Sequence, residues 1–304
     1  MNLIKPKFEI LEQQPGIDGI YKMIELAGRT CYRSEDKITP DSAAAFVDRM
    51  IKSGHGAMLE HGTVYLRIPI YAATSYKIDE YKNNPYSKTQ INLNGESCYY
   101  ITTNMRVLVE HNWLEDLKYI CEPTEYHEKR VTVRFICDRG VSHEFVRHRV
   151  FSFAQESTRY CDYTSRKFSN ECTFIIPCWT TLEPGFYEQY DDENYSYYPD
   201  DYTDCKRKMQ VDKDWNTLNP QDEFLTSMFD AEYRYRRLRS FGWTAQQART
   251  VLPNSLKTEL VMTGFTSDWK HFFKLRDAGS AHPQAQELAK PLHEEFIRRN
   301  YINE

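Results

Sequence analysis

Two stretches of this chain alternate between apolar and polar side chains, and they constrain the fold more than any other feature. The apolar positions are Val64, Leu66, Ile68 and Ile70 in the first stretch and Val131, Val133, Phe135 and Cys137 in the second. Because successive side chains of a strand point to opposite faces, each stretch predicts a β-strand with one buried face. Pro69 lacks a backbone donor, so it indicates a sheet edge or the end of the strand. We expect the two strands to pair, and residues 99–103 fit a further strand.

Helical spacing of apolar residues, together with capping signals, predicts helices around this sheet. The predicted helices cover residues 17–27 with Asp18 as N-cap and Gly28 as C-cap, a segment from Thr39-Pro40 to Gly54, a segment from about Ser142 that includes residues 147–149, a long helix from Asn219-Pro220 to about Ser240, a helix with a capping box from Thr244 to Gln247, and a final pair that begins at Ser267. The fold class that follows is α+β, with a mixed, mainly antiparallel sheet flanked by helices.

Charge and composition exclude two kinds of protein. The net charge is -5, so we expect no nucleic-acid partner, and any anion site must be a local basic pocket in an acidic body. No apolar run approaches the roughly 20 residues that a membrane-spanning helix needs, so no membrane partner is expected.

The chain has eight cysteines without a Cys-x-x-Cys pair, and its first residues do not read as a signal peptide. We therefore expect reduced thiols and a cytoplasmic location.

One short segment, residues 147–160, gathers groups that bind anions. It reads Arg147-His148-Arg149-Val150-Phe151-Ser152-Phe153-Ala154-Gln155-Glu156-Ser157-Thr158-Arg159-Tyr160. An arginine fork gives two parallel charge-assisted hydrogen bonds to a phosphate or carboxylate, and amide and hydroxyl groups lie between these arginines. A phosphorylated ligand is one interpretation. The other is a charge cluster at a helix end, in which local acids such as Glu144 and Glu156 pair with the arginines.

Other segments imitate catalytic motifs without meeting their requirements. His143 and His148 are five residues apart, which turns them to different faces of a helix, so a zinc-hydrolase motif is rejected. Around His55 the sequence offers two histidines and one glutamate without a fixed geometry, and we expect no metal. We interpret Pro177-Cys178, which Trp179 follows, as the end of a strand. No cysteine of the chain has a low-pKa context with a base partner, so we expect no cysteine nucleophile.

The spacing inside residues 147–160 resembles the signature of the flavin-dependent thymidylate synthases, in which Arg-His-Arg is followed after seven residues by Ser and then by Arg. Other segments resemble landmarks of that family in the same order along the chain. They are residues 28–32, His55 with Glu60-His61, Ala248-Arg249-x-x-Leu252-Pro253, and Leu275-Arg276 followed by His282.

The resemblance implies a methyltransferase that converts dUMP to dTMP. The one-carbon donor would be 5,10-methylenetetrahydrofolate, the hydride carrier FAD and the reductant NADPH, with no cysteine nucleophile. The family resemblance also implies a single domain over residues 1–304 with insertions at about 71–130 and 183–218. That domain would assemble as a homotetramer that binds FAD between subunits. No Gly-x-Gly-x-x-Gly occurs, so we expect no dinucleotide-binding fold.

The resemblance also assigns individual residues. Those implied for dUMP are Arg147, Gln155, Ser157, Thr158, Arg159, Arg249 and Arg276, and Arg276 would be catalytic by polarising the pyrimidine. Those implied for FAD are Cys31, His55, Glu60, Arg147, His148, Arg149, His271 and His282. Ser157 is assigned to binding because no His or Lys base has a fixed spacing to it. Two alternatives remain: a relative that hydroxymethylates a pyrimidine nucleotide, and a non-catalytic nucleotide-binding protein.

Overall fold

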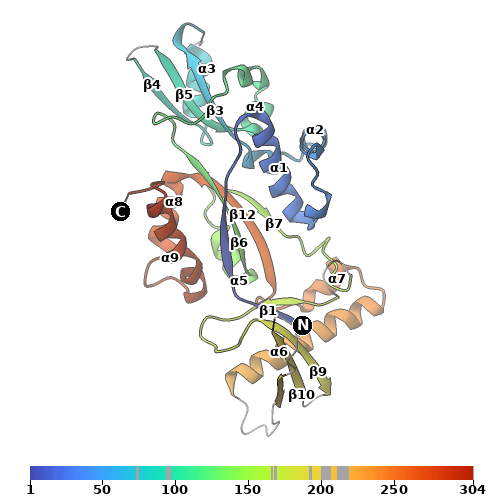
Figure 1. Cartoon of the computed structure of the whole chain (residues 1–304). Coiled ribbons are helices and arrows are strands. Elements are labelled where there is room, and N and C mark those ends of the chain that lie inside the picture. The colour runs from blue at the N-terminus through green and yellow to red at the C-terminus, as the bar shows by residue number, and fades with distance from the viewer. Residues whose placement is uncertain are drawn as a thin grey trace.

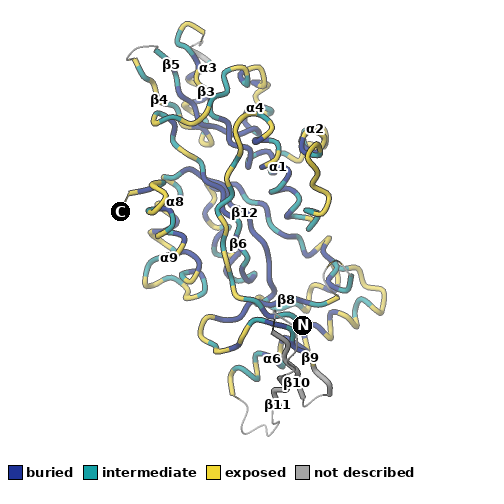
Figure 2. The backbone as a smooth tube through the Cα atoms, in the orientation of Figure 1, coloured by how far each residue is buried: buried dark blue, intermediate teal, exposed yellow. Residues whose placement is uncertain are grey.

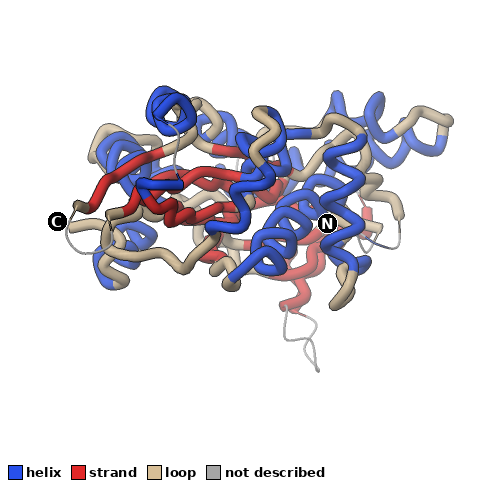
Figure 3. Tube along the Cα trace, turned by 90° about the horizontal axis from the view of Figure 1, so that it is seen from above, coloured by secondary structure: helices blue, strands red, loops and turns tan. Residues whose placement is uncertain are grey.

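The structure, a computed structural model, describes residues 1–72, 75–93, 97–165, 167, 170–191, 194–199, 207–210 and 219–303. The second predicted insertion, 183–218, therefore lies partly outside the described residues. Within them, helices flank three sheets, whose strands lie between the helices in Figure 3. The described part of the chain holds no helix that is long and apolar enough to cross a membrane.

A four-stranded antiparallel sheet forms the centre of the molecule (Figure 1). Its order is β2 (Lys7–Leu11), β6 (Arg130–Asp138), β12 (Lys257–Phe265) and β7 (Ser152–Gln155). Every residue of β12 is buried, as the dark tube in Figure 2 shows. The sequence patterns did not predict this strand, in which Leu260-Val261-Met262 is the only continuous apolar stretch.

The two faces of this sheet belong to different hydrophobic clusters. Ala154 and Val261 pack with α1 (Gly16–Tyr32) on one face. Leu260, Met262 and Phe135 pack on the other face against α8 (Thr266–Arg276) and α9 (Pro283–Arg298). Figure 1 shows α1 on one side of the sheet and α8 and α9 on the other. Neighbouring positions along β7 and β12 therefore reach different surroundings, which decides where the candidate site residues lie.

A second sheet contains the first strand predicted from sequence. Its order is β3 (Thr63–Pro69), β5 (Cys98–Asn104) and β4 (Lys88–Asn92), all antiparallel. The strands at 63–69, 98–104 and 130–138 are confirmed, and Pro69 ends an edge strand. The expected pairing of β3 with β6 is wrong, because β5 takes the place beside β3 and β6 lies between β2 and β12. In the sequence, α3 (Ser75–Asn83) lies between β3 and β4, and α4 (Met105–Glu110) follows β5.

The third sheet has the order β11 (Arg207–Gln210), β10 (Asn194–Pro199), β9 (Gly185–Asp191), β1 (Asn2–Ile4) and β8 (Thr173–Ile175). Its β1–β8 pair is parallel, whereas its other described pairs are antiparallel. Leu3 and Phe174 pack against Leu225 and Tyr235 of α6 (Pro220–Ser240). Helices with mainly antiparallel sheets confirm the predicted α+β class.

The helices at the start of the chain are longer or later than predicted. α1 runs through Gly28 to Tyr32, so Gly28 is not a C-cap. A Cβ at Gly28 would lie 2.5 Å from Phe46 Cζ of α2 (Ser42–Lys52), and the glycine therefore permits close packing of the two helices. The N-cap positions are Pro15 and Asp41 rather than the predicted Asp18 and Thr39.

Later helix signals were more reliable. Asn219 accepts hydrogen bonds at the start of α6, and the capping box of Thr244 and Gln247 is present before α7 (Ala245–Ala248), so both predictions are confirmed. Ser267 is not a cap, because α8 already begins at Thr266 and the Asp268 carboxylate accepts the N–H of Phe265.

Candidate functional site

The Arg-His-Arg segment lies in a turn, not in a helix as predicted. Asp138 caps α5 (Arg139–Phe145) by accepting the Val141 N–H at 2.7 Å, and the helix ends before Arg147. The turn buries His148 and leaves Arg147 and Arg149 exposed. Neither exposed arginine has an ion pair among the described residues. The turn therefore holds two positive charges that remain available to an anion.

The nearby acids do not neutralise this turn. Glu144 Oε2 lies 2.5 Å from Arg276 Nη1, and Glu156 Oε2 lies 2.7 Å from Lys257 Nζ. The interpretation of residues 147–160 as a helix-end cluster paired with Glu144 and Glu156 is therefore wrong.

Arg276 and His148 form one contact group on the α8 side of the sheet. Arg276 Nε donates to His148 Nε2 at 3.1 Å, and its Nη2 donates to the Glu144 carbonyl at 2.8 Å. Because arginine can only donate, His148 must accept at Nε2 and is neutral in this arrangement. Burial, and then the charge of Arg276, lowers the pKa of His148 to about 4. The ring of His271 lies 6.1 Å from that of His148.

A second contact group lies where β7 leaves the sheet, at the end of α1. Arg249 Nη1 donates to Thr158 Oγ1 at 3.0 Å, and the Ser157 N–H donates to the Cys31 carbonyl at 3.0 Å. Arg159 Nε contacts Gln246 Oε1 at 3.4 Å. Both arginines are exposed and neither has an acidic partner among the described residues. The structure thus brings together five of the predicted residues.

Gln155 points away from this second group. Its Nε2 donates to Ser142 Oγ of α5 at 2.9 Å and approaches Thr258 Oγ1 at 3.3 Å. Gln155 therefore shares the α5 and α8 face with His148 and Arg276, whereas its neighbour Ala154 packs on the α1 face. The predicted residues are divided between the two faces of one sheet.

The other residues predicted for FAD are scattered. His55 is exposed and precedes η2 (Gly56–His61), in which Glu60 pairs with Arg106 at 2.5 Å. His282 is exposed at the N-cap of α9, with its ring 6.0 Å from that of Trp179. The Cys31 thiol contacts Met58 Sδ at 3.9 Å, and burial raises its pKa to about 11. One copy of the described chain does not assemble these residues into a single pocket.

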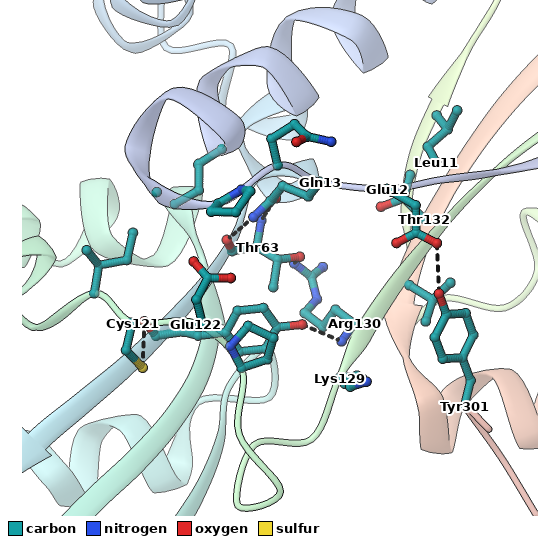
Figure 4. Close-up of a pocket in the computed structure, with 18 residues that line it drawn as sticks. Leu11, Glu12, Gln13, Thr63, Cys121, Glu122, Lys129, Arg130, Thr132 and Tyr301 are labelled. Carbon is teal, nitrogen blue, oxygen red and sulfur yellow. Dashed lines mark hydrogen bonds between the residues drawn. The ribbon is translucent and has the colours of Figure 1, made fainter. Parts of the chain in front are cut away.

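A cavity of about 170 Å³ lies elsewhere, between β2, β3 and β6 (Figure 4). No predicted site residue lines it. Some of its polar groups contact one another: the Arg130 N–H donates to the Tyr65 hydroxyl at 3.2 Å, and the Tyr301 hydroxyl donates to Glu12 Oε1 at 2.8 Å. This hollow is therefore not the place that the motif residues mark.

A set of buried charges, which the sequence patterns did not predict, lies next to the second group. Lys257 and Glu259 lie on β12, and Glu156 follows β7. All three are at most 9% exposed. The sequence feature that could have indicated this set is the pair Lys257 and Glu259, two residues apart at the start of an apolar segment. If that segment is a buried strand, charged side chains on it must be paired.

The profile of the family described as "Thymidylate synthase complementing protein" matches residues 122–299, which is more than half of the chain. The chain belongs to this family. The resemblance that the motifs indicated is thereby confirmed, and the match spans Arg147 to His282.

Relatives within the family carry a more specific name. A protein of Corynebacterium glutamicum named "Flavin-dependent thymidylate synthase" is 24% identical over 287 residues, covering 92% of this chain and 76% of the relative. A protein of Mycolicibacterium gilvum with the same name is 25% identical over 281 residues, with the same coverage. Among solved structures, a UMP/dUMP methylase PolB from Streptomyces cacaoi bound with 5-Br dUMP gives a TM-score of 0.42 at 18% identity, covering 98% of this chain and 93% of the other.

Proposed function

We propose that this protein is a methyltransferase that converts dUMP to dTMP, with 5,10-methylenetetrahydrofolate as one-carbon donor, FAD as hydride carrier and NADPH as reductant. Membership of the family and the shared name of its relatives support the proposal.

One observation carries the nucleotide assignment. Arg147, Arg149, Arg159 and Arg249 are exposed and have no acidic partner among the described residues, in a chain whose net charge is -5. Arg234 and Arg236 on α6, by contrast, pair with Asp230 and Glu232. Four arginines kept free of acids suit phosphate groups, which accept charge-assisted hydrogen bonds from their forks.

The thiols support a reaction without a cysteine nucleophile. Burial raises the pKa of Cys31 to about 11 and that of Cys161 to about 12, and it also raises the pKa of Cys137, Cys172 and the exposed Cys178. A thiolate, not a thiol, is the nucleophile, so these cysteines of the described chain are poorly suited to attack a pyrimidine. Electrostatic activation by arginine is the remaining means that the proposed residues offer.

Arg276 is proposed as the catalytic residue. Three of its N–H groups are engaged, by Glu144 and by His148, which leaves two of its five donors for a ligand. His148, neutral and buried, accepts from Arg276 and holds its orientation. A guanidinium fixed in this way can stabilise negative charge that develops on the pyrimidine, because little reorganisation is needed when the charge forms.

The donor set also fits FAD. The two exposed arginines of the turn, Arg147 and Arg149, suit the pyrophosphate, and His55, His271 and His282 are exposed enough to reach a ligand. When bound, the flavin supplies the hydride for the methyl group. Because one copy of the chain divides these residues between two faces of a sheet, we propose a homotetramer in which neighbouring subunits complete each site. Its subunit would be one domain with insertions at about 71–130 and 183–218.

The test is an absorbance spectrum of the purified protein, followed by incubation with dUMP, 5,10-methylenetetrahydrofolate and NADPH and analysis of the nucleotide. We expect a flavin spectrum and dTMP. A flavin spectrum together with another C5-substituted nucleotide as product would mean that the protein catalyses a related one-carbon reaction instead of methylation. Protein that binds no flavin even when FAD is added would contradict the proposal.

A further inference from the structure

Five polar side chains form a buried chain of contacts beneath residues 157–159. Lys257 Nζ lies 2.7 Å from Glu156 Oε2 and 2.7 Å from Glu259 Oε1. Glu259 also pairs with Arg33, and the Tyr163 hydroxyl donates to Glu156 Oε1 at 3.1 Å. Glu156 is 2% exposed and Glu259 is 4% exposed, so these charges are almost completely removed from water. We call Arg33, Glu156, Tyr163, Lys257 and Glu259 the buried network.

The buried network joins the three segments that carry the second contact group. Arg33 lies two residues after Cys31 at the end of α1, and Glu156 directly precedes Ser157. Lys257 begins β12, which follows η6 (Arg249–Val251) with its exposed arginine. The network therefore fixes the relative positions of the three segments whose residues would meet the nucleotide.

The backbone is held at the same place. The Glu156 N–H donates to the Glu259 carbonyl at 2.8 Å, and the Ser157 N–H donates to the Cys31 carbonyl at 3.0 Å. Thr158 Oγ1 then accepts from Arg249. Hydrogen bonds therefore fix three successive residues, 156, 157 and 158, and the first of them also belongs to the buried network.

Stability alone does not account for buried ions at this place. Removing charges from water is costly, and well-packed apolar residues of similar size often stabilise a protein as well or better. Arg33 moreover has φ of 48°, a left-handed conformation that few non-glycine residues adopt. This residue ends α1, a position at which the left-handed conformation is common, and its ion pair with Glu259 ties the end of α1 to β12. Hydrogen bonds and ion pairs are directional, so a network of them fixes the relative positions of the segments more precisely than apolar packing does.

We propose that Lys257 and Glu156 are positioning residues for the nucleotide: they hold residues 156–158 so that Ser157, Thr158 and Arg249 face it. This inference rests on the proposed function, because dUMP is the ligand that these residues would meet. Neither residue touches the reacting atoms, so their loss affects nucleotide binding more than the chemical step.

The test compares three variants of the full-length chain: Lys257→Met, Lys257→Arg, and the double variant Glu156→Leu with Lys257→Met. The double variant removes both charges of one pair and leaves Glu259 paired with Arg33, so it should unfold at a higher temperature than Lys257→Met, in which Glu156 is left buried without its cation. We expect the KM for dUMP to rise about tenfold or more in Lys257→Met and in the double variant, with a much smaller change in kcat. Lys257→Arg keeps the charge, and a neighbouring cavity of about 240 Å³ gives it room, so it should restore most of the affinity.

A matched control is available near the second sheet, on α3. Lys77 Nζ contacts Asp116 Oδ1 at 2.8 Å, and Asp116 also accepts from the Tyr81 hydroxyl at 2.9 Å. Lys77→Met should lower the unfolding temperature and leave the KM for dUMP unchanged. If Lys257→Met does not fold, the double variant and Lys257→Arg decide the matter.

Two failures can be told apart. If the unmodified protein does not bind dUMP, the proposed function fails and this inference fails with it. If the unmodified protein binds dUMP and the folded double variant binds it equally well, the buried network is only structural and this inference alone is overturned. The same holds if kcat falls while KM does not change.

Discussion

The two faces of the four-stranded sheet hold candidate site residues in opposite electrostatic states. On the α1 side, Arg159 and Arg249 are exposed and contact the neutral groups of Gln246 and Thr158. On the α8 side, Arg276 is mostly buried and contacts the carboxylate of Glu144 at 2.5 Å. The first arrangement keeps the full positive charge available, whereas the second fixes direction and gives up net charge.

This difference indicates two separate roles for the arginines of the motifs: binding the ligand and stabilising charge during the reaction. Arginines without an acidic partner keep their whole charge for a ligand, and in Arg159 and Arg249 only contacts with neutral groups orient the side chain. A guanidinium held by an acid and a neutral histidine has a fixed orientation and retains two donors. We therefore expect substitutions on the α1 side to weaken binding, and substitution of Arg276 to slow the reaction.

The largest effect is expected for Arg276→Ala. Removing a fixed donor aimed at developing charge lowers the rate by about 100- to 1,000-fold. The variant should lose dUMP-dependent oxidation of reduced flavin while it keeps its bound flavin, as measured by stopped-flow absorbance. Lys274→Ala, an exposed cation on the same helix, is the control and should react normally. Normal turnover by Arg276→Ala would remove the catalytic assignment.

Arg249→Ala should act on binding alone. Loss of a charge-assisted contact with the nucleotide weakens dUMP binding by about 10- to 100-fold, whereas flavin content stays the same. The unfolding temperature should also change little, because Arg249 is exposed and has no acidic partner among the described residues. Calorimetric titration with dUMP measures the effect, with Arg234→Ala as the control because Arg234 is exposed and paired with Asp230. An equal loss in both variants would mean that only the overall charge matters.

Arg149→Ala should weaken flavin retention about tenfold, because one of two cations in the turn is lost. The flavin-to-protein absorbance ratio after gel filtration measures it. Arg237→Ala on α6, where the arginine contacts Tyr233, should retain flavin normally. Unchanged flavin content in Arg149→Ala would exclude Arg149 from the cofactor site.

The sequence predicted local elements far better than their partners. The strands at 63–69 and 130–138 follow from a two-residue period, and the capping box at Thr244 follows from residue types at fixed spacing. Strand pairing depends on contacts between distant segments, which no local period encodes. β5, from within the predicted first insertion, took the place beside β3 and left β6 to pair with β2 and β12.

The candidate site shows the same limit. The spacing of residues 147–160 singled out these arginines, and the family match covers them. The sequence could not tell that Glu144 and Glu156 would turn to Arg276 and Lys257 instead, because both acids are near the turn in sequence. Nor could it show that Gln155 and Ser157, two residues apart, would have contacts on different sides of the sheet.

The last prediction concerns the stability of the folded chain and the neutral histidine that holds Arg276. His148 is 7% exposed, and its pKa in the folded chain is lowered to about 4 from an ordinary 6.5. As the pH falls, the unfolded chain takes up this proton first, so the folded chain loses stability from about pH 6.5 down to about pH 4, at no more than about 1.4 kcal/mol per pH unit. His148→Gln can still accept from Arg276 but does not titrate. Urea unfolding of both proteins between about pH 7 and about pH 4 should therefore show a smaller loss of stability in the variant. Equal losses in the two proteins would mean that His148 is protonated without disturbing Arg276, and the contact between them would then not depend on a neutral histidine.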